Sequence, residues 1–327
     1  MSFSYEGKRI LVTGAGGFIG GWLTKDLLRM GASSIVAVDI KEMENWYQIS
    51  DGIENRVLDL RSSESCKSVL KNVDLVFNLA ADMGGMGFIE NNKALCMLSV
   101  LINSNLLFYG LEQGVERYFF ASSACVYNQQ LQKSSGHTGL REDDAYPADP
   151  EDGYGWEKLF SERMCRHFLE DFGVETRVAR FHNVYGPHGT YDGGREKAPA
   201  AICRKIAIAK MNNLKEIEIW GDGSQIRSYM FIDDCIRGIH EITRGEYSRP
   251  INLGSSESVS VNELVNIVST IAGVSLSKKY DLNAPKGVNG RNSDNTLIRD
   301  LFDWEPQMTL REGLELTYEW IYEELSK

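Results

Sequence analysis

The fold is decided by the stretch Gly14-Ala15-Gly16-Gly17-Phe18-Ile19-Gly20, which follows an apolar run and opens a helical pattern. Gly14 permits a tight turn, Gly17 lets the backbone approach a pyrophosphate, and Gly20 lets the helix pack closely on the strand. Free backbone N–H groups at a helix N-terminus stabilise phosphate charge. The stretch therefore predicts a dinucleotide-binding turn in which Phe18 and Ile19 also contact the ligand. The alternative is a glycine turn that binds nothing.

Apolar runs typical of buried parallel strands recur through the first half of the chain. They are Arg9 to Val12, Ser34 to Val38, Arg56 to Leu58, Leu75 to Asn78 and Tyr118 to Ala121. Helical patterns lie between them, such as Gly20 to Met30, which ends at Gly31 as a helix C-cap would. The alternation predicts an α/β fold with a Rossmann-type doubly wound parallel sheet, whose ligands lie at the carboxyl ends of the strands.

The second half of the chain is mixed. Helices are expected at Tyr154 to Phe172, Pro199 to Lys210, Val261 to Ala272 and Leu310 to Leu325, and strands at Val174 to Arg180, Ile217 to Trp220 and Ser228 to Ile232. We expect residues 1–183 to form an NAD-binding Rossmann domain and residues 184–327 to form mainly a smaller, C-terminal, mixed α/β substrate-binding lobe. The boundary is expected to be discontinuous, because residues 228–254 contain patterns that resemble a return to the first domain.

Composition excludes several classes of function. The 327 residues carry a formal net charge of −11, which disfavours nucleic acid as a partner. The six cysteines lack Cys-x-x-Cys spacing, so neither a metal site nor a disulfide framework is expected. Met1 to Arg9 lacks the apolar core of a signal peptide, and we expect no run long enough to span a bilayer. A soluble, cytoplasmic protein without a membrane partner is the expectation.

The cofactor is predicted from residues at the strand ends. Asp39 closes the second run, about twenty residues beyond the glycine stretch, as an acceptor for ribose hydroxyls does. Its carboxylate repels a 2′-phosphate, which favours NAD over NADP. Asp59 and Leu60 after the third run, and Ala80 after the fourth, are expected to approach the adenine and the dinucleotide backbone. Each of these residues alone is also compatible with an ordinary strand end.

A second motif carries acid–base chemistry. Tyr154 and Lys158 are four residues apart and share one helix face, so the ammonium is expected to lower the pKa of the phenol. The phenolate can then take a proton from an alcohol. Upstream, the run Ser122-Ser123-Ala124-Cys125 adds hydroxyls and a thiol to the same expected strand end. The alternatives are a solvated helix face for the pair and a small buried hydrophobe for Cys125.

With these residues in place, the chain resembles the extended short-chain dehydrogenase/reductase family of nucleotide-sugar enzymes over nearly its whole length. Ser123, Tyr154 and Lys158 match that family's catalytic triad. Further stretches resemble the GDP-mannose 3,5-epimerase branch of the family: residues 81–89, 122–125, 180–183, 193–201 and 290–295. No counterpart is recognised for Asn128 to Gly139.

The resemblance implies an isomerase that uses NAD and oxidises C4 of GDP-D-mannose transiently. The resulting ketone acidifies the hydrogens on C3 and C5, and inversion gives GDP-L-galactose, with GDP-L-gulose as the C5-only epimer. The resemblance further implies that Cys125 is the base and Lys197 the acid for inversion, while Tyr154 deprotonates the 4-hydroxyl. It also implies a homodimer. Without the resemblance, Lys197 would be interpreted as a solvated charge.

Several residues are expected to hold the GDP-sugar. Five of them, all in matching stretches, are Met83, Gly84, Gly85, Ser123 and Lys197. The candidates for hydrogen bonds to hydroxyl groups are Asn183, Glu196 and Gln225. The candidates for neutralising the diphosphate are Lys205, Arg227 and Arg291. Taken singly, such cations are more often surface charges. His182 and His188 have no further ligand at useful spacing, so we interpret both as core or loop residues.

Two rival functions are considered. A related 4-epimerase or 4,6-dehydratase shares the fold. A dehydratase usually carries an acidic pair near the position that Cys125 occupies here, whereas the neighbours of Cys125 in this sequence, Ala124 and Val126, are not acidic. A non-catalytic NAD-sensing protein is the rival of another class. Such a protein is expected to lose Tyr154 or Lys158, and both are present.

Overall fold

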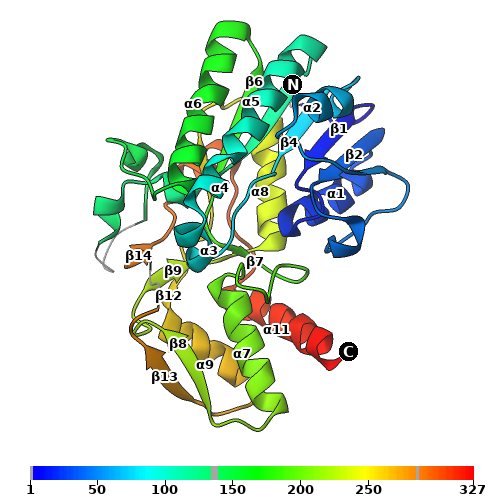
Figure 1. Ribbon diagram of the computed structural model, residues 1–327. Helices are drawn as coiled ribbons and strands as arrows, with labels where there is room; N and C mark the ends of the chain where they lie inside the picture. The colour runs from blue at the N-terminus through cyan, green and yellow to red at the C-terminus, as the bar shows by residue number, and fades with distance from the viewer. Residues whose placement is uncertain (1–2, 134–138, 285–286) are drawn as a thin grey trace.

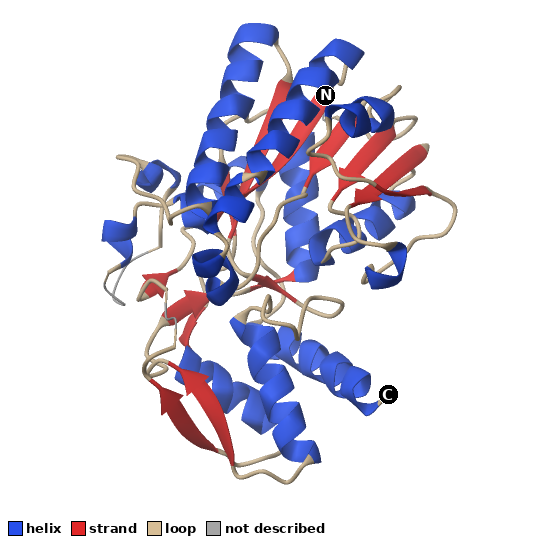
Figure 2. Ribbon diagram, viewed as in Figure 1, coloured by secondary structure: helices blue, strands red, loops and turns tan. Residues whose placement is uncertain are grey.

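The structure is a computed structural model that describes residues 3–133, 139–284 and 287–327. The start of the Met1 to Arg9 stretch and the middle of the Asn128 to Gly139 segment fall outside the described residues. Seven parallel strands form the central sheet, in the order β11-β6-β5-β4-β1-β2-β3. Figure 2 shows strands in red lying among the blue helices. Their bounds are β1 Arg9–Thr13, β2 Ser34–Asp39, β3 Glu54–Val57, β4 Leu75–Asn78, β5 Arg117–Ser123, β6 Glu175–Phe181 and β11 Ile251–Leu253. The predicted Rossmann-type sheet is thus confirmed.

Helices cover both faces of this sheet, as Figure 1 shows. The helices of this half are α1 Phe18–Arg29, α2 Ser63–Val69, α3 Met86–Asn91, α4 Lys93–Met97, α5 Ser99–Gln113, α6 Tyr154–Phe172 and α8 Ile232–Arg244. Helix α1 packs beside α8, whereas α5 packs beside α2 and α6. The expected helix Tyr154 to Phe172 is confirmed at both ends.

The core consists of two apolar layers, one on each face of the sheet. Ile10 and Val12 belong to one layer and Leu11 to the other, because successive strand side chains point to opposite faces. The same division separates Phe77 from Val76 in β4. Burial on both faces explains why these strands read as continuous apolar runs rather than as alternating ones.

Most of the rest of the chain builds a lower lobe (Figure 1). Its elements are β7 Val184–Tyr185, α7 Ala198–Met211, β8 Glu216–Trp220, β9 Ile226–Ser228, β10 Met230–Phe231, β12 Ser258–Ser260, α9 Val261–Ala272, β13 Ser277–Asp281, β14 Gly290–Arg291 and α11 Leu310–Ser326. Helix α10 Thr296–Phe302 packs instead against β11 of the central sheet. Helix α7 packs against both α9 and α11. The domain division at residue 183 stays a prediction, although β11 pairs with β6 and so joins the central sheet.

One strand prediction is wrong. Ser228 to Ile232 is not a single strand, because β9 ends at Ser228 and α8 begins at Ile232. The strand β9 pairs with β12 and β14, whereas β10 pairs with β7. The chain therefore passes from one sheet to another at Tyr229. The apolar pattern of the sequence does not show this change, because it does not show which strands pair.

The expectation that no run is long enough to span a bilayer also needs correction. The segment Lys93–Gln113 is sufficiently long and apolar by length and composition alone. In the structure it divides into α4 and α5, and α5 packs against α2 and α6. A core helix passes the same test, so the pattern is weak evidence for a membrane span.

Candidate active site

The glycine stretch forms the turn between β1 and α1. Gly14 has φ +68°, a conformation that side chains other than that of glycine rarely adopt, and a Cβ there would lie 2.9 Å from the carbonyl oxygen of Leu79. A Cβ on Gly20 would lie 2.2 Å from the carbonyl oxygen of Gly14. Gly17 is the N-cap of α1, and glycine has no side chain that could accept hydrogen bonds from the first N–H groups of the helix. The first N–H groups of α1 therefore stay available to an anion.

A pocket of about 570 Å³ lies at the carboxyl ends of the central strands, large enough for a cofactor-sized ligand. Its lining brings together most of the residues predicted from sequence for the cofactor and for catalysis. They are Gly14, Gly17, Phe18, Ile19, Gly20, Asp39, Asp59, Leu60, Ala80, Met83, Ser123, Tyr154, Lys158 and Lys197. Residues more than a hundred positions apart thus meet in one cavity.

Two acidic residues at or just after the ends of β2 and β3 differ in how their carboxylates are engaged. Asp39 accepts a hydrogen bond from the backbone N–H of Lys41 at 3.0 Å, which orients its carboxylate at the end of β2. Asp59 is held by Arg61, whose Nη2 donates at 2.8 Å, and this pairing lowers the pKa of Asp59. Arg61 also lines the pocket and was not predicted. Its position two residues after a strand-end aspartate is the signal that sequence analysis passed over.

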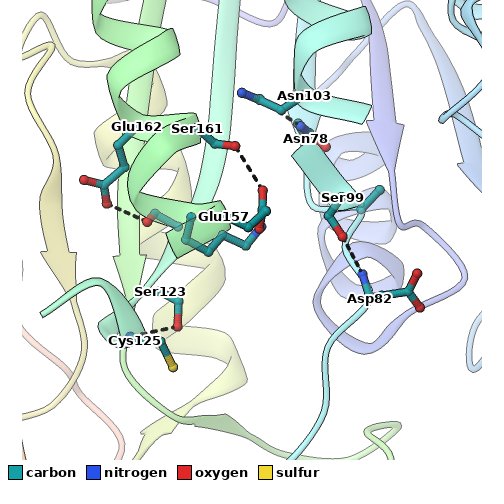
Figure 3. A network of polar contacts seen from close by, with 12 residues as sticks. Asn78, Asp82, Ser99, Asn103, Ser123, Cys125, Glu157, Ser161 and Glu162 are labelled. Atoms are coloured by element: carbon teal, nitrogen blue, oxygen red, sulfur yellow. Dashed lines mark hydrogen bonds and ion pairs between the residues drawn. The ribbon is translucent and has the colours of Figure 1, made fainter. Parts of the chain in front are cut away.

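Tyr154 and Lys158 lie in the first turns of α6. The Lys158 Nζ lies 5.6 Å from the centre of the Tyr154 ring and 3.5 Å from the Glu157 carboxylate. The expected lowering of the phenol pKa is wrong in this structure. Burial raises the pKa of Tyr154 well above its usual value, with further contributions from Cys125 and Glu157, and the Ser123 hydroxyl opposes the rise only in part. Glu157, itself held by the Ser161 hydroxyl at 2.9 Å, offsets the charge of Lys158 (Figure 3).

Ser123 ends β5, and Cys125 lies in the 3₁₀ turn that follows it. The Ser123 hydroxyl accepts a hydrogen bond from the Cys125 backbone N–H at 3.2 Å, as Figure 3 shows. The Cys125 thiol packs beside Tyr154 in a small apolar cluster. Burial, followed by the charge of Glu151, raises the pKa of this thiol to about 11.

Two charged residues lie next to this thiol. Arg291 places Nη1 at 3.5 Å from the Cys125 Sγ and Nη2 at 2.5 Å from Glu151, while its Nε donates to Gln132 at 2.6 Å. Arg291 therefore turns toward the thiol, whereas we expected it to neutralise a diphosphate. Glu151 is a residue that sequence analysis missed. The residues next to Cys125 in the sequence carry no carboxylate, but in the folded chain Glu151, from the loop before α6, lies close to the thiol.

Lys197 is the residue before α7 and lines the same pocket. Burial lowers the pKa of its ammonium, which Cys125 opposes and Arg291 reinforces. The loop that carries Lys197 is joined to the residues after β4, because Gly85 donates its N–H to the Arg195 carbonyl at 3.0 Å. A Cβ on Gly84 or Gly85 would press on this loop, at 3.2 Å and 2.6 Å respectively. These two glycines thus pack against the loop and do not line the pocket.

The remaining predicted residues lie outside the lining of the pocket. Asn183 donates to the Ser228 carbonyl at 3.0 Å, Glu196 pairs with Arg204 at 3.1 Å and Lys205 donates to the Glu218 carbonyl at 2.8 Å. Gln225 is buried, and its Oε1 has no hydrogen-bond partner in the part of the chain that the structure describes. Burial, with the charge of Arg291, lowers the pKa of Arg227 to about 10.

The two histidines occupy core and loop positions. His182 is buried and contacts Asn252 at 2.9 Å through Nε2, while His188 packs between Trp22 and Trp320. Within residues 3–133, 139–284 and 287–327, no group of three His, Cys, Asp or Glu side chains could hold a metal ion.

Comparison with known proteins extends these observations. Residues 10–254 match the NAD dependent epimerase/dehydratase family. GDP-mannose 3,5-epimerase 1 of Oryza sativa subsp. indica is 46% identical over 323 residues, which cover 98% of this chain and 84% of that protein. GDP-mannose 3,5-epimerase of Arabidopsis thaliana is 44% identical with the same coverage.

Solved structures show the same fold. UDP-glucose 4-epimerase of Thermotoga maritima, with UDP-glucose, matches with a TM-score of 0.87 at 24% identity, covering 97% of this chain and 99% of that one. This likeness concerns the fold alone. MoeE5, solved with UDP-glucose and NAD, matches with a TM-score of 0.82 at 29% identity, covering 97% of this chain and 99% of that one.

Proposed function

The chain belongs to the NAD dependent epimerase/dehydratase family, and from this premise we propose that it inverts C3 and C5 of GDP-D-mannose. It is an NAD-dependent nucleotide-sugar epimerase whose products are GDP-L-galactose and GDP-L-gulose, formed through a transient 4-keto sugar. The observation that carries the proposal is the single pocket that joins the glycine turn and Asp39 to Ser123, Tyr154, Lys158 and Lys197. Nearly full-length likeness to GDP-mannose 3,5-epimerases supports the choice of substrate.

The pocket fits NAD. At Gly14 and Gly20 a Cβ would collide with backbone, so the turn leaves room for a pyrophosphate against bare main chain. We assign the pyrophosphate to the N-terminus of α1 and the adenosine ribose to Asp39, whose charge disfavours a 2′-phosphate. When bound there, NAD would supply reversible hydride transfer at C4 of the sugar, with no net redox change over the reaction.

Oxidation at C4 needs a base on the 4-hydroxyl. We assign this role to Tyr154, with Ser123 holding the sugar hydroxyl and Lys158 adjusting the phenol. The hydrogen-bonding influence of Ser123 on Tyr154 supports this arrangement, because it favours the phenolate. The high resting pKa of Tyr154 means that the phenol is protonated before the ligands enter, so the positive charges of the assembled site must favour the phenolate.

Inversion needs an acid and a base on opposite faces of the sugar ring. We assign the base to Cys125 and the acid to Lys197. Burial lowers the pKa of the Lys197 ammonium, which makes it a better proton donor near neutral pH. Because C3 and C5 both flank the C4 ketone, one pair of groups can serve both carbons once the ring has changed conformation.

The remaining substrate contacts are proposed for residues around this pair. Met83 lines the pocket, and Gly84 and Gly85 shape the loop that carries Lys197. Asn183, Glu196 and Gln225 are assigned to hydroxyl groups, and Gln225 has a buried Oε1 without a partner among the described residues. The cations proposed for the diphosphate are Lys205 and Arg227. Arg291 was expected there too, but its guanidinium is turned to Cys125, Glu151 and Gln132.

A homodimer is also proposed. Large apolar side chains stand exposed on the outer faces of α5 and α6, namely Leu101, Phe108, Trp156 and Phe160. The two helices pack side by side (Figure 1). Exposed apolar surface of this kind marks association sites. We propose that the partner is a second copy of the chain. Sedimentation of the NAD-bound protein over a range of concentrations measures the oligomeric state. The proposed compartment is the cytoplasm.

One experiment separates oxidation from inversion. Tyr154→Phe is expected to abolish both the nicotinamide absorbance of NADH and the entry of solvent deuterium into GDP-D-mannose. Cys125→Ala is expected to retain some transient NADH while losing inversion, because the thiol acts only after the ketone has formed. Near-normal epimerisation by Cys125→Ala would show that the thiol is structural.

A further inference from the structure

A buried ion pair lies directly against the proposed base. Cys125, Glu151 and Arg291 come from three separate segments, and each is no more than 7% exposed. Glu151 is tied to the cysteine by its backbone as well, since its N–H donates to the Cys125 carbonyl at 3.0 Å. The Arg291 guanidinium bridges the two side chains, at 2.5 Å from Glu151 and 3.5 Å from the sulfur.

The arrangement fixes the guanidinium rigidly. Gln132 accepts from its Nε at 2.6 Å, so three different partners hold three of its nitrogens. One oxygen of Glu151, Oε2, is buried and has no hydrogen-bond partner among the described residues. The Glu151 carboxylate also acts on the Cys125 thiol by hydrogen bonding, which raises the pKa of the thiol beyond the effects of burial and charge.

The charges of the pair act on the thiol in opposite directions. While the thiol is neutral, Glu151 and Arg291 cancel; a thiolate leaves the group with one net negative charge. Glu151 therefore disfavours the thiolate, and Arg291 favours it. The other titratable groups that interact with the cluster are Lys197, Arg227 and Tyr154.

We propose that Glu151 is a positioning residue, which holds Arg291 against the Cys125 sulfur and sets through its charge how readily that thiol gives up its proton. The inference rests on the proposed function, in which Cys125 is the base. In that reaction the thiol first loses its proton to solvent. The thiolate then takes the proton from C5 or C3, and the electron pair of the broken C–H bond passes into the enolate of the 4-keto sugar.

The test compares the pH dependence of deuterium entry into GDP-D-mannose for NAD-bound wild type, Glu151→Gln and Arg291→Gln. Removing the negative charge is expected to move the rising limb of the profile to lower pH, and removing the positive charge to higher pH. On that limb a shift of one pH unit is a tenfold change in rate at fixed pH. Glu151→Asp keeps the charge and is expected to stay near the wild-type profile, while the double variant Glu151→Gln/Arg291→Gln lies between the single ones.

A structural role gives a different result, because damage to packing lowers the rates without moving the two profiles in opposite directions. Unshifted profiles, or shifts of the same sign, overturn the inference. Alkylation of Cys125 by iodoacetamide, followed by mass spectrometry from pH 6 to 10 without substrate, makes the same comparison on the thiol itself. If wild type exchanges no deuterium, the proposed function fails; the alkylation profiles still decide the role of Glu151, with opposite shifts supporting it and equal profiles refuting it.

Discussion

Replacing Gly20 by alanine tests how closely the fold and the cofactor site are coupled. The added Cβ would lie 2.2 Å from the Gly14 carbonyl oxygen, whereas ordinary contact begins near 3.4 Å. The turn must therefore move by about 1 Å, and a hydrogen bond lengthened by that amount is lost. Overpacking of this kind costs about 1–3 kcal/mol of folding free energy.

The larger effect is expected on NAD. A backbone N–H that donates to a charged oxygen contributes about 1.5–3 kcal/mol, so losing one such bond to the pyrophosphate weakens binding by roughly 10- to 150-fold. Titration calorimetry with NAD on cofactor-stripped protein measures this change, and urea unfolding measures stability.

Gly173→Ala is the matched control. Gly173 has φ +73° and nothing within 4 Å of its added Cβ, so the variant carries backbone strain of about 1 kcal/mol without touching the turn. It is expected to lose stability but to bind NAD as wild type does. If Gly20→Ala binds NAD within twofold of wild type, the pyrophosphate does not lie on this turn.

Three further outcomes are expected. Asp39→Ala should lose the preference for NAD over NADP, with NAD affinity falling about tenfold or more, and equal affinities already in wild type would contradict the assignment. Burial lowers the pKa of His182 from 6.5 to about 3, so the folded state binds fewer protons than the unfolded chain between these pH values. The free energy of unfolding therefore falls as pH drops from 6.5 toward 3, by up to about 1.4 kcal/mol per pH unit. His182→Gln should show a flatter dependence of the unfolding free energy on pH, and an unchanged slope would refute this. Lys197→Met should incorporate deuterium into recovered starting sugar without inversion, and efficient formation of L-sugars would exclude Lys197 as the acid.

The fold was predictable because its signals are local. The glycine turn, the apolar runs of β1, β2 and β4 and the helix at Tyr154 each depend on neighbours in sequence, and periodicity reports such neighbours directly. The break at Tyr229 was not predictable in this way. It depends on which distant strand each half of the run pairs with, and pairing partners leave no mark on hydropathy.

The candidate site was predictable in its parts but not in its electrostatics. Sequence motifs brought Tyr154 and Lys197 to one pocket, as the structure has them. The pKa of Tyr154 moves opposite to expectation, because burial depth and the charge of Glu157 are properties of packing. Glu151 was missed for the same reason: nothing in its sequence context shows that Arg291, 140 residues away, meets it beside Cys125.

In the proposed reaction, protons exchange at both carbons beside a transient C4 ketone of GDP-D-mannose. Incubation of the NAD-bound protein with GDP-D-mannose in deuterated water, followed by NMR of the recovered sugars, measures this exchange directly. Deuterium is expected at C5 of GDP-L-gulose and at C3 and C5 of GDP-L-galactose, and none at C4, because the C4 hydrogen is exchanged with the cofactor and not with solvent. Deuterium confined to other positions, or a product inverted only at C4, would refute the proposed reaction.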